Sequence, residues 1–274
     1  MIIDSHQHFW QLSRGDYTWL TPKLKTLYRD FSPQDLQPYL EKSGIDSTIL
    51  VQAAATLEET QFLLGIAKEN EFVKGVVGWV NMEAENAPVL IRHLAQNQYL
   101  VGLRPMTQDI ADTDWMLTPH LTPAYETMIE LNLTFDALIQ PRHLKNLKIL
   151  VERYPALKVV IDHAAKPSIN THEFEPWASQ LTSLKENKQV YCKLSGLVTE
   201  AGKNWSYDDL KPYMDHLLYC FGTQRILWGS DWPILTLNAT YAEWYTLCRN
   251  YISQYFPTGL ENIFSGNATQ IYGL

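Results

Sequence analysis

The sequence predicts an α/β protein that folds as one distorted (β/α)₈ (TIM) barrel over residues 1–274. Eight short apolar segments alternate with helical segments of about 10 to 16 residues, an order typical of parallel strands joined by crossover helices. The chain has 274 residues and 46% hydrophobic content, which suits one barrel with a large core. No composition shift marks a domain boundary. No glycine-rich turn follows the first strand, which disfavours an open doubly wound sheet.

The first predicted strand ends in a pair of histidines. Asp4, His6 and His8 occupy alternate positions after an apolar start. Because alternate side chains of a strand share a face, we expect all three to point the same way. Two imidazoles on one face can bind a metal or polarise a carbonyl oxygen. Two solvated surface histidines are the competing interpretation, and the position of the pair at the end of an apolar strand favours a functional role.

A long segment without a helical period follows, from Gln11 to Asp30, and it contains Gly15 and Pro22. A structureless loop of about 20 residues is uncommon in a compact domain and tends to be functional. We expect this loop to cover the barrel mouth and to place Tyr17 or Trp19 against a ligand. The alternative is that these aromatic side chains fix the loop to the barrel rim.

The other elements follow in regular order. A helix begins at Ser32 and Pro33, an N-cap and a first-turn proline, and ends at Gly44. Seven further strands are predicted at Thr48–Gln52, Val73–Val80, Tyr99–Leu103, Thr134–Ile139, Lys158–Ile161, Gln189–Leu194 and Arg225–Trp228. The later helices are predicted at Leu57–Asn70, Pro88–Gln96, Ala124–Leu131, Pro141–Tyr154, Glu175–Glu186, Asp208–Tyr219 and Tyr241–Tyr251, with a short C-terminal helix from Leu260.

Composition excludes several classes of partner. The net charge of −8 argues against nucleic acid and anionic membranes as partners, and no run of about 18 apolar residues could span a bilayer. Residues 1–10 lack the features of a secretion signal, so we expect a cytoplasmic protein. The scattered Cys192, Cys220 and Cys248 are expected to be reduced thiols. Nine Trp and 15 Tyr suit an aromatic ligand pocket or a subunit interface, so a homodimer stays open.

Polar residues at the predicted strand ends form the candidate site, because barrel active sites lie at the carboxyl ends of the strands. His6 and His8 end strand one, His163 follows strand six and Asp231 follows strand eight. Further candidates at strand ends are Gln52, Trp79, Arg104, Lys193, Ser195 and either Asp136 or Gln140. Two structural alternatives remain: Arg104 pairs with a barrel carboxylate such as Asp136, and Trp79 caps the barrel rim. The remaining histidines are expected to be structural or solvated: His93, His120, His143, His172 and His216.

Four motifs together resemble the amidohydrolase superfamily, in particular its amidohydrolase-2 branch. They are Asp4-x-His6-x-His8, Asp162-His163 after strand six, Gly229-Ser230-Asp231-Trp232 after strand eight, and the closing segment Asn262–Leu274. Three shorter phrases resemble sugar lactonases such as L-fuconolactonase and L-rhamnonolactonase, and the pyrone-dicarboxylate lactonase. These are His8-Phe9-Trp10, Tyr17-Thr18-Trp19-Leu20 and Lys193-Leu194-Ser195-Gly196.

The resemblance implies a hydrolase that opens a sugar-acid lactone with water. Asp231 is the only carboxylate among the four converging groups, so we expect it to be the general base. We expect His6, His8 and His163 to polarise the carbonyl. Substrate contacts are expected from the side chains of Arg104, Gln52, Trp19, Tyr17, Trp79, Lys193 and Ser195.

The metal content is a separate expectation. Two-metal members of the superfamily carry Lys or Glu after strand four and His after strand five, whereas this chain has Arg104-Pro105 and no histidine in Thr134–Gln140. A binuclear site is therefore not expected. A single zinc or other divalent metal on His6, His8, His163 and Asp231 suits the ligand types. Because the lactonase branch includes members that work without metal, we expect none to be required.

Three other functions stay open, and the least favoured is a structural or oligomeric partner protein, because the four polar strand-end groups would then lack a purpose. A metal-dependent amidohydrolase or a non-oxidative decarboxylase would use the same residues, and tight binding of one zinc with loss of activity on chelation would favour it. A non-catalytic sugar-binding barrel would bind a sugar ligand without turnover.

Overall fold

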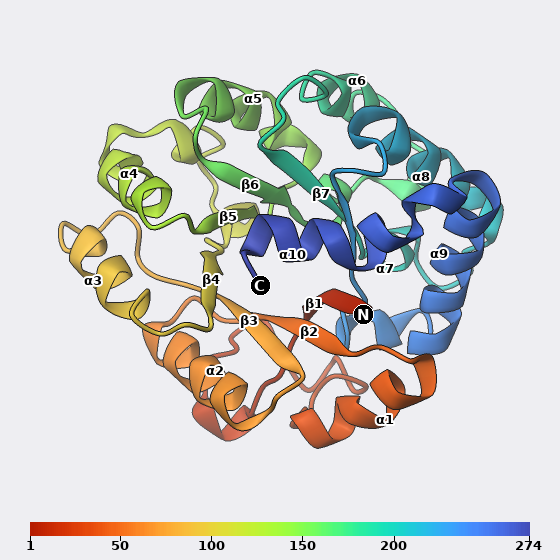
Figure 1. Ribbon diagram of the computed structural model, residues 1–274, viewed down its shortest axis with the longest axis horizontal. Coiled ribbons are helices and arrows are strands. Elements are labelled where there is room, and N and C mark those ends of the chain that lie inside the picture. The colour runs from red at the N-terminus through yellow and green to blue at the C-terminus, as the bar shows by residue number, and fades with distance from the viewer.

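The computed structural model describes residues 1–274 and contains one sheet of eight parallel strands. The strands are β1 Ile3–Gln7, β2 Ser47–Val51, β3 Val73–Gly78, β4 Leu100–Leu103, β5 Thr134–Ala137, β6 Lys158–Ile161, β7 Val190–Leu194 and β8 Ile226–Trp228. Each strand pairs with the next along the chain, and helices surround the sheet (Figure 1). The predicted eight-stranded α/β barrel is therefore confirmed.

The barrel closes between β1 and β8 through the residues at their carboxyl ends. The backbone N–H of Asp231 donates to the carbonyl of His6, and that of His8 donates to the carbonyl of Trp232, each at 2.8 Å. Gln7 and Trp232 form the parallel bridge between these segments. The closure thus places the histidine pair beside Asp231 through main-chain bonds alone.

Helices cover the outside of the barrel and one of its ends. They are α1 Pro33–Ser43, α2 Leu57–Glu69, α3 Ala87–Leu94, α4 Thr122–Glu130, α5 Leu144–Arg153, α6 Trp177–Thr182, α7 Leu197–Ala201, α8 Tyr207–Phe221, α9 Tyr241–Tyr255 and α10 Asn267–Tyr272. The short helix α7 was not predicted, because five residues are too few to show a helical period. None of the helices combines the length and apolar content needed to cross a membrane.

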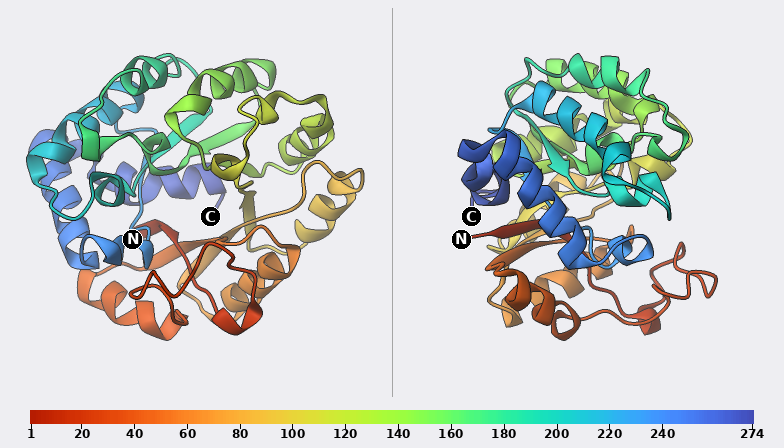
Figure 2. Two further views of the ribbon diagram at one scale, coloured as in Figure 1. Left: turned by 180° about the vertical axis from the view of Figure 1, so that it is seen from behind. Right: turned by 90° about the vertical axis from the view of Figure 1, so that its right-hand side faces the viewer.

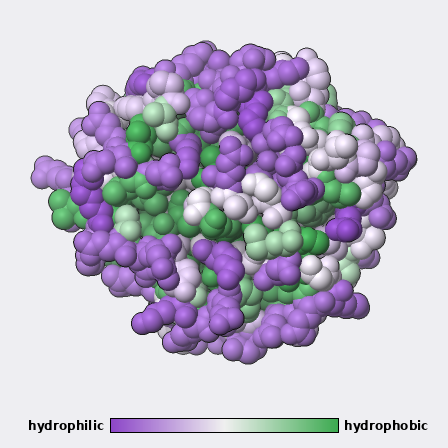
Figure 3. All heavy atoms as spheres, viewed as in Figure 1, coloured by the Kyte–Doolittle hydropathy of each residue, from purple (hydrophilic) through white to green (hydrophobic).

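Helix α10 plugs the amino-terminal end of the barrel. Its Ala268, Ile271 and Tyr272 pack against side chains from the strands, including Ile3, Ile49, Val51, Val77, Val101, Val160, Tyr191 and Leu227. In Figure 2, α10 and both termini lie at one end of the barrel, and the loop after β1 lies at the opposite end. Figure 3 shows apolar side chains gathered over the middle of the α10 face and hydrophilic ones along its rim. With this end filled, a ligand enters from the other.

Candidate active site

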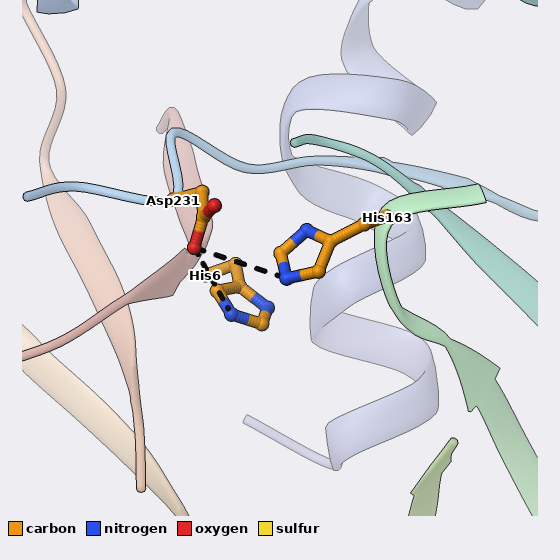
Figure 4. A group of neighbouring side chains, drawn as sticks. All are labelled: His6, His163 and Asp231. Carbon is orange, nitrogen blue, oxygen red and sulfur yellow. Dashed lines mark ion pairs between the residues drawn. The ribbon is translucent and has the colours of Figure 1, made fainter. Parts of the chain in front are cut away.

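Three histidines and one aspartate meet at the carboxyl ends of β1, β6 and β8. Oδ1 of Asp231 lies 3.4 Å from Nε2 of His8, 3.7 Å from Nε2 of His6 and 3.8 Å from Nε2 of His163. The Nε2 atoms of His6 and His8 are 3.2 Å apart. All four side chains are buried, and Figure 4 shows His6, His163 and Asp231 converging from separate segments. The structure thus brings together the four residues that the sequence analysis placed at strand ends.

The backbone that carries His163 is held in an unusual conformation. Residues 163–166 follow β6 with φ of 50°, 54°, 60° and 51°, which is left-handed throughout. Such a conformation costs roughly 1–2 kcal/mol for each L-residue, so the surroundings must hold it. The indole N–H of Trp177 donates to the carbonyl of Ala164 at 2.7 Å. Gly196 is required beside the run, because a Cβ there would lie 2.7 Å from the ring of His163.

Asp4 does not join the histidines, so the prediction that it shares their face is wrong. The register of β1 against β2 shifts between Asp4 and Gln7, and this shift breaks the simple alternation. The carboxylate of Asp4 accepts hydrogen bonds from the backbone N–H of Ser230 and the hydroxyl of Tyr241, both at 2.8 Å. Asp4 therefore fixes the segment that carries Asp231.

Hydrogen bonds fix the orientation of two of the imidazole rings. Nδ1 of His8 lies 2.7 Å from the carbonyl oxygen of Val51, which can only accept, so this nitrogen carries a hydrogen. In the neutral ring, Nε2 of His8 then faces the site as an acceptor. Nδ1 of His163 pairs with Oγ of Ser195 at 2.8 Å, which directs its Nε2 toward Asp231.

A network of buried charges lies beneath the histidines, inside the barrel. Nζ of Lys193 is 2.7 Å from Oδ2 of Asp136 and 3.0 Å from Oδ1 of Asp162. Nη1 of Arg104 donates to Oδ2 of Asp162 at 3.0 Å. The hydroxyl of Tyr272, in α10, donates to Asp136 at 2.7 Å. The positive charges of Lys193 and Arg104 are therefore balanced by the carboxylates of Asp136 and Asp162 in the buried interior of the barrel.

Three of the expected substrate contacts support neighbouring side chains and do not line the cavity. Lys193 is fully buried among carboxylates, and Ser195 bonds to His163. The amide of Gln52 donates to the carbonyl of Arg104 at 2.9 Å, and its Oε1 accepts from the guanidinium of Arg104 at 3.1 Å. The sequence placed these residues at strand ends, but it did not show which group each side chain contacts.

Of two further expected substrate contacts, Arg104 lines the cavity and Trp79 does not. Arg104 also pairs with a barrel carboxylate, as the structural alternative expected, but the partner is Asp162 and not Asp136. The backbone N–H and carbonyl of Trp79 bond to the hydroxyl of Thr60, and its side chain is half-buried.

A cavity of about 250 Å³ opens beside the cluster. It is lined by His8, Trp19, Ala53, Arg104, Met106, Gln108, Asp109, Leu138, His163, Lys166, Asp231 and Ile234. The sequence analysis did not assign several of these, notably Lys166, Gln108 and Asp109. They lie in loops after β4 and β6, where neither periodicity nor a strand end identifies them.

The loop after β1 covers one side of the cavity. The indole N–H of Trp19 donates to the carbonyl of Ala53 at 2.8 Å, and its ring meets Trp10 edge to face at 5.5 Å. Tyr17 is buried against Trp10 and does not line the cavity. Trp10 and Phe31 exchange backbone hydrogen bonds of 3.0 Å that join the two ends of the loop. Of the two expected aromatic contacts, Trp19 is therefore the one that faces a ligand.

Burial sets the protonation states of the cluster. Burial lowers the pKa of His163 to about 4 and that of His6 well below its usual range. Burial alone would raise the pKa of Asp231, but the neighbouring imidazoles, His163 foremost, hold it below its ordinary value. At neutral pH, the carboxylate of Asp231 therefore lies beside the uncharged imidazoles of His6 and His163.

Comparison with known proteins identifies the family. The amidohydrolase family model (Amidohydro_2) matches residues 3–274. The chain belongs to the amidohydrolase family. This amidohydrolase is 43% identical to an L-fucono-1,5-lactonase of Burkholderia ambifaria, over 98% of this chain and 94% of that protein. It is 32% identical to an L-fucono-1,5-lactonase of Burkholderia multivorans, over 99% of this chain and 96% of that protein.

Solved structures agree with the family. A crystal structure of an amidohydrolase from Burkholderia multivorans with bound zinc matches with a TM-score of 0.92 and 32% identity, over 100% of this chain and 99% of that one. A probable 2-pyrone-4,6-dicarboxylic acid hydrolase from Acinetobacter baumannii matches with a TM-score of 0.82 and 20% identity, over 100% and 99% of the two chains. The second likeness shows the fold alone.

Three of the facing side chains, those of His6, His163 and Asp231, could hold a single divalent metal. Around a tetrahedral zinc, neighbouring ligand atoms lie about 3.3 Å apart. The separations of 3.4, 3.7 and 3.8 Å from Asp231 to the three histidines are close to that value. Ligand atoms of His6, His163 and Asp231 all lie within 4.8 Å of one another. The bond from Nδ1 of His8 to a backbone carbonyl is also typical of metal-binding histidines.

Proposed function

We propose that this amidohydrolase opens a sugar-acid lactone, such as L-fucono- or L-rhamnono-lactone, by adding water. The observation that carries the proposal is the carboxylate of Asp231 within 3.4 to 3.8 Å of three imidazole nitrogens beside a cavity. Such a cluster suits water addition to a carbonyl group. The two L-fucono-1,5-lactonases, 43% and 32% identical over nearly the whole chain, support the substrate class.

Asp231 acts as the general base. It is ionised at neutral pH and lines the cavity, so it accepts a proton from water as the water oxygen attacks the lactone carbonyl. Nε2 of His8, an acceptor 3.2 Å from Nε2 of His6, orients this water from the side of the cavity. This role replaces the carbonyl donor expected for His8, because its one hydrogen is bonded to Val51. A carboxylate of low pKa is a weak base, so stabilisation of the oxyanion must supply much of the rate.

Arg104, whose side chain lines the cavity, supplies donors for that oxyanion, and His6 lies behind it. Nζ of Lys193 lies 3.2 Å from Nδ1 of His6, and an ammonium can only donate. This contact favours the hydrogen of the neutral His6 ring on Nε2, which lies 3.2 Å from Nε2 of His8 and does not face the cavity. The guanidinium of Arg104 carries a permanent positive charge, and its Nη1, 3.4 Å from Nε2 of His6, can only donate and so makes no hydrogen bond to a protonated Nε2. Donors held in a buried site cost little reorganisation during the reaction.

Ring opening completes the reaction. The bond between the carbonyl carbon and the ring oxygen breaks, and Asp231 returns its proton to that oxygen, which becomes a hydroxyl. The oxygen of the attacking water stays in the new carboxyl group. The acid then releases its proton and leaves as an aldonate anion.

A divalent metal held by His6, His8, His163 and Asp231 would polarise the carbonyl and acidify a bound water. We propose that turnover does not require one, since Arg104 provides donors from the chain itself.

A panel of lactones, assayed by proton release, tests the proposal. Metal-stripped protein would be given L-fucono-, L-rhamnono- and D-glucono-1,5-lactone, and δ-valerolactone as a lactone without hydroxyls. We expect kcat/KM of about 10⁴ M⁻¹ s⁻¹ or more on at least one sugar lactone. Absence of turnover on every sugar lactone would contradict the function. Activity that disappears with a chelator and returns with zinc would contradict only the metal-independent part.

A further inference from the structure

We propose that Lys166 binds the carboxylate that lactone hydrolysis creates, an inference that rests on the proposed function. The substrate is a neutral ester, and the product is an anion. A cation that faces the cavity and has no other ionic partner would therefore distinguish product from substrate. Lys166 faces the cavity and forms no ion pair, and the carboxyl of Glu200, which borders the neighbouring hollow, is the one on which its charge acts.

The other two cations at the site are neutralised. Arg104 pairs with Asp162 at 3.0 Å, and Lys193 pairs with two carboxylates inside the barrel. Lys166 lines the cavity together with His163 and Asp231, is half-buried, and has no carboxylate oxygen within the 4.0 Å of an ion pair. Its ammonium is thus the cavity cation that remains for an anionic ligand.

The position of Lys166 is built into the backbone. Lys166 ends the left-handed run of residues 163–166, and His163 begins it. The backbone N–H of Lys166 donates to the carbonyl of His163 at 2.7 Å, so the two residues are joined by one tight turn. Strained backbone of this kind persists where the surrounding structure holds it, and it is concentrated at functional sites. The turn holds Lys166 beside His163, whose side chain lines the cavity.

Lys166 also borders a second, polar hollow. This hollow shares Lys166, Gln108 and Asp109 with the cavity, and it is completed by Gln140, Pro141, Arg142, Ser168 and Glu200. The guanidinium of Arg142 is engaged by Oε1 of Gln140 and by the carbonyl of Gln108, each at 3.0 Å. Lys166 therefore lies where a hydroxyl-rich, anionic product would pass out of the cavity.

The experiment compares two ligands that differ only in the carboxylate. Sodium L-fuconate carries the product carboxylate, and L-fucitol carries a hydroxymethyl group in its place. Their Kd values would be measured by calorimetry at fixed ionic strength on the wild type, Lys166→Met, Lys166→Arg and Lys166→Gly. The glycine variant removes the ammonium and also relieves the left-handed backbone, so misfolding cannot explain its result. Lys68→Met, on the exposed face of α2, controls for the loss of one charge from the protein.

We expect fuconate to bind the wild type about tenfold more tightly than fucitol, which corresponds to one charge-assisted contact. This preference should disappear in Lys166→Met and Lys166→Gly and persist in Lys166→Arg and Lys68→Met. Equal binding of both ligands by the wild type, or a preference that survives in the methionine and glycine variants, would overturn the role of Lys166. Calorimetry needs no turnover, so a failed lactone panel with an intact preference would count against the proposed function alone.

Discussion

Nζ of Lys193 lies 3.2 Å from Nδ1 of His6, and Oδ1 of Asp162 lies 3.4 Å from the same ring nitrogen. One neighbour donates and the other accepts, so they favour opposite placements of the single hydrogen of a neutral imidazole. Donation from Lys193 puts the hydrogen on Nε2, where it points to Nε2 of His8 and blocks Nε2 of His6 as a metal ligand. Acceptance by Asp162 puts it on Nδ1 and leaves Nε2 free to bind a metal.

The first prediction follows from this opposition. Asp162→Asn should weaken zinc binding by about 10- to 100-fold, the usual effect of losing a carboxylate behind a metal-binding histidine. Lys193→Gln should leave zinc binding unchanged or tighter, because it removes the group that holds the hydrogen on Nε2. Zinc Kd would be measured by competition with a chelating dye. Asp136→Asn is the matched control, since Asp136 contacts Lys193 and Tyr272 but not His6. Equal losses in the Asp136 and Asp162 variants would contradict this explanation.

The second prediction concerns the base. Asp231→Asn should lower kcat on the active lactone by about 10²- to 10⁴-fold, because an amide cannot accept the proton of the attacking water. Lactone binding should be retained, and a thermal melt would confirm the fold. Asp208→Asn, at the first turn of α8, is a control without a place in the site. A kcat within a factor of three of the wild type would show that another group acts as the base.

The third prediction concerns the loop after β1. Trp19→Ala should mainly raise KM, because the indole lines the cavity and holds the loop to Ala53. Tyr17→Phe is the control, since Tyr17 lies in the same loop but does not line the cavity. Steady-state kinetics on each active lactone would separate KM from kcat. An unchanged KM for every substrate in the Trp19 variant would remove the loop from substrate binding.

Much of the barrel and the central cluster could be predicted from the sequence, because both depend on local signals. Strand and helix alternation is visible in the pattern of apolar residues, and His6, His163 and Asp231 lie at strand ends within recognisable motifs. The barrel then brings strand ends together irrespective of the intervening sequence. For this reason, residues more than 60 positions apart could be assigned to one site.

The features of the site that the sequence did not predict depend on contacts between residues that are distant in the chain. Lys166 follows two alanines in a segment without a local signal, and its left-handed turn depends on Trp177 and Gly196. The side chain of Asp4 does not lie on the same face as the histidines, because the register of β1 shifts between Asp4 and Gln7. The residue types in this segment do not indicate such a shift. Lys193 was expected to contact the substrate, since a sequence does not show that two carboxylates from β5 and the end of β6 surround it.

The last prediction concerns stability and pH. Glu59, at the start of α2, is fully buried, and its carboxylate accepts from the backbone N–H groups of Ala53 and Ala54 at 3.0 and 2.8 Å. Burial raises the pKa of Glu59 to about 7, above the value of 4.5 expected in the unfolded chain. Between these values the folded state binds more protons than the unfolded state, so the contribution of Glu59 to stability falls as the pH rises.

Glu59→Gln should abolish that part of the pH dependence. From the two pKa values, the free energy of unfolding of the wild type relative to the glutamine variant should fall by about 2 kcal/mol between pH 5.5 and pH 8. Urea unfolding of both proteins at the two pH values measures this difference. Glu58→Gln, its exposed neighbour, should show no such change. The free energy of unfolding of the wild type, relative to the glutamine variant, could instead stay constant or increase toward pH 8. That result would mean that Glu59 is ionised at both pH values and that the backbone N–H groups of Ala53 and Ala54 stabilise its charge.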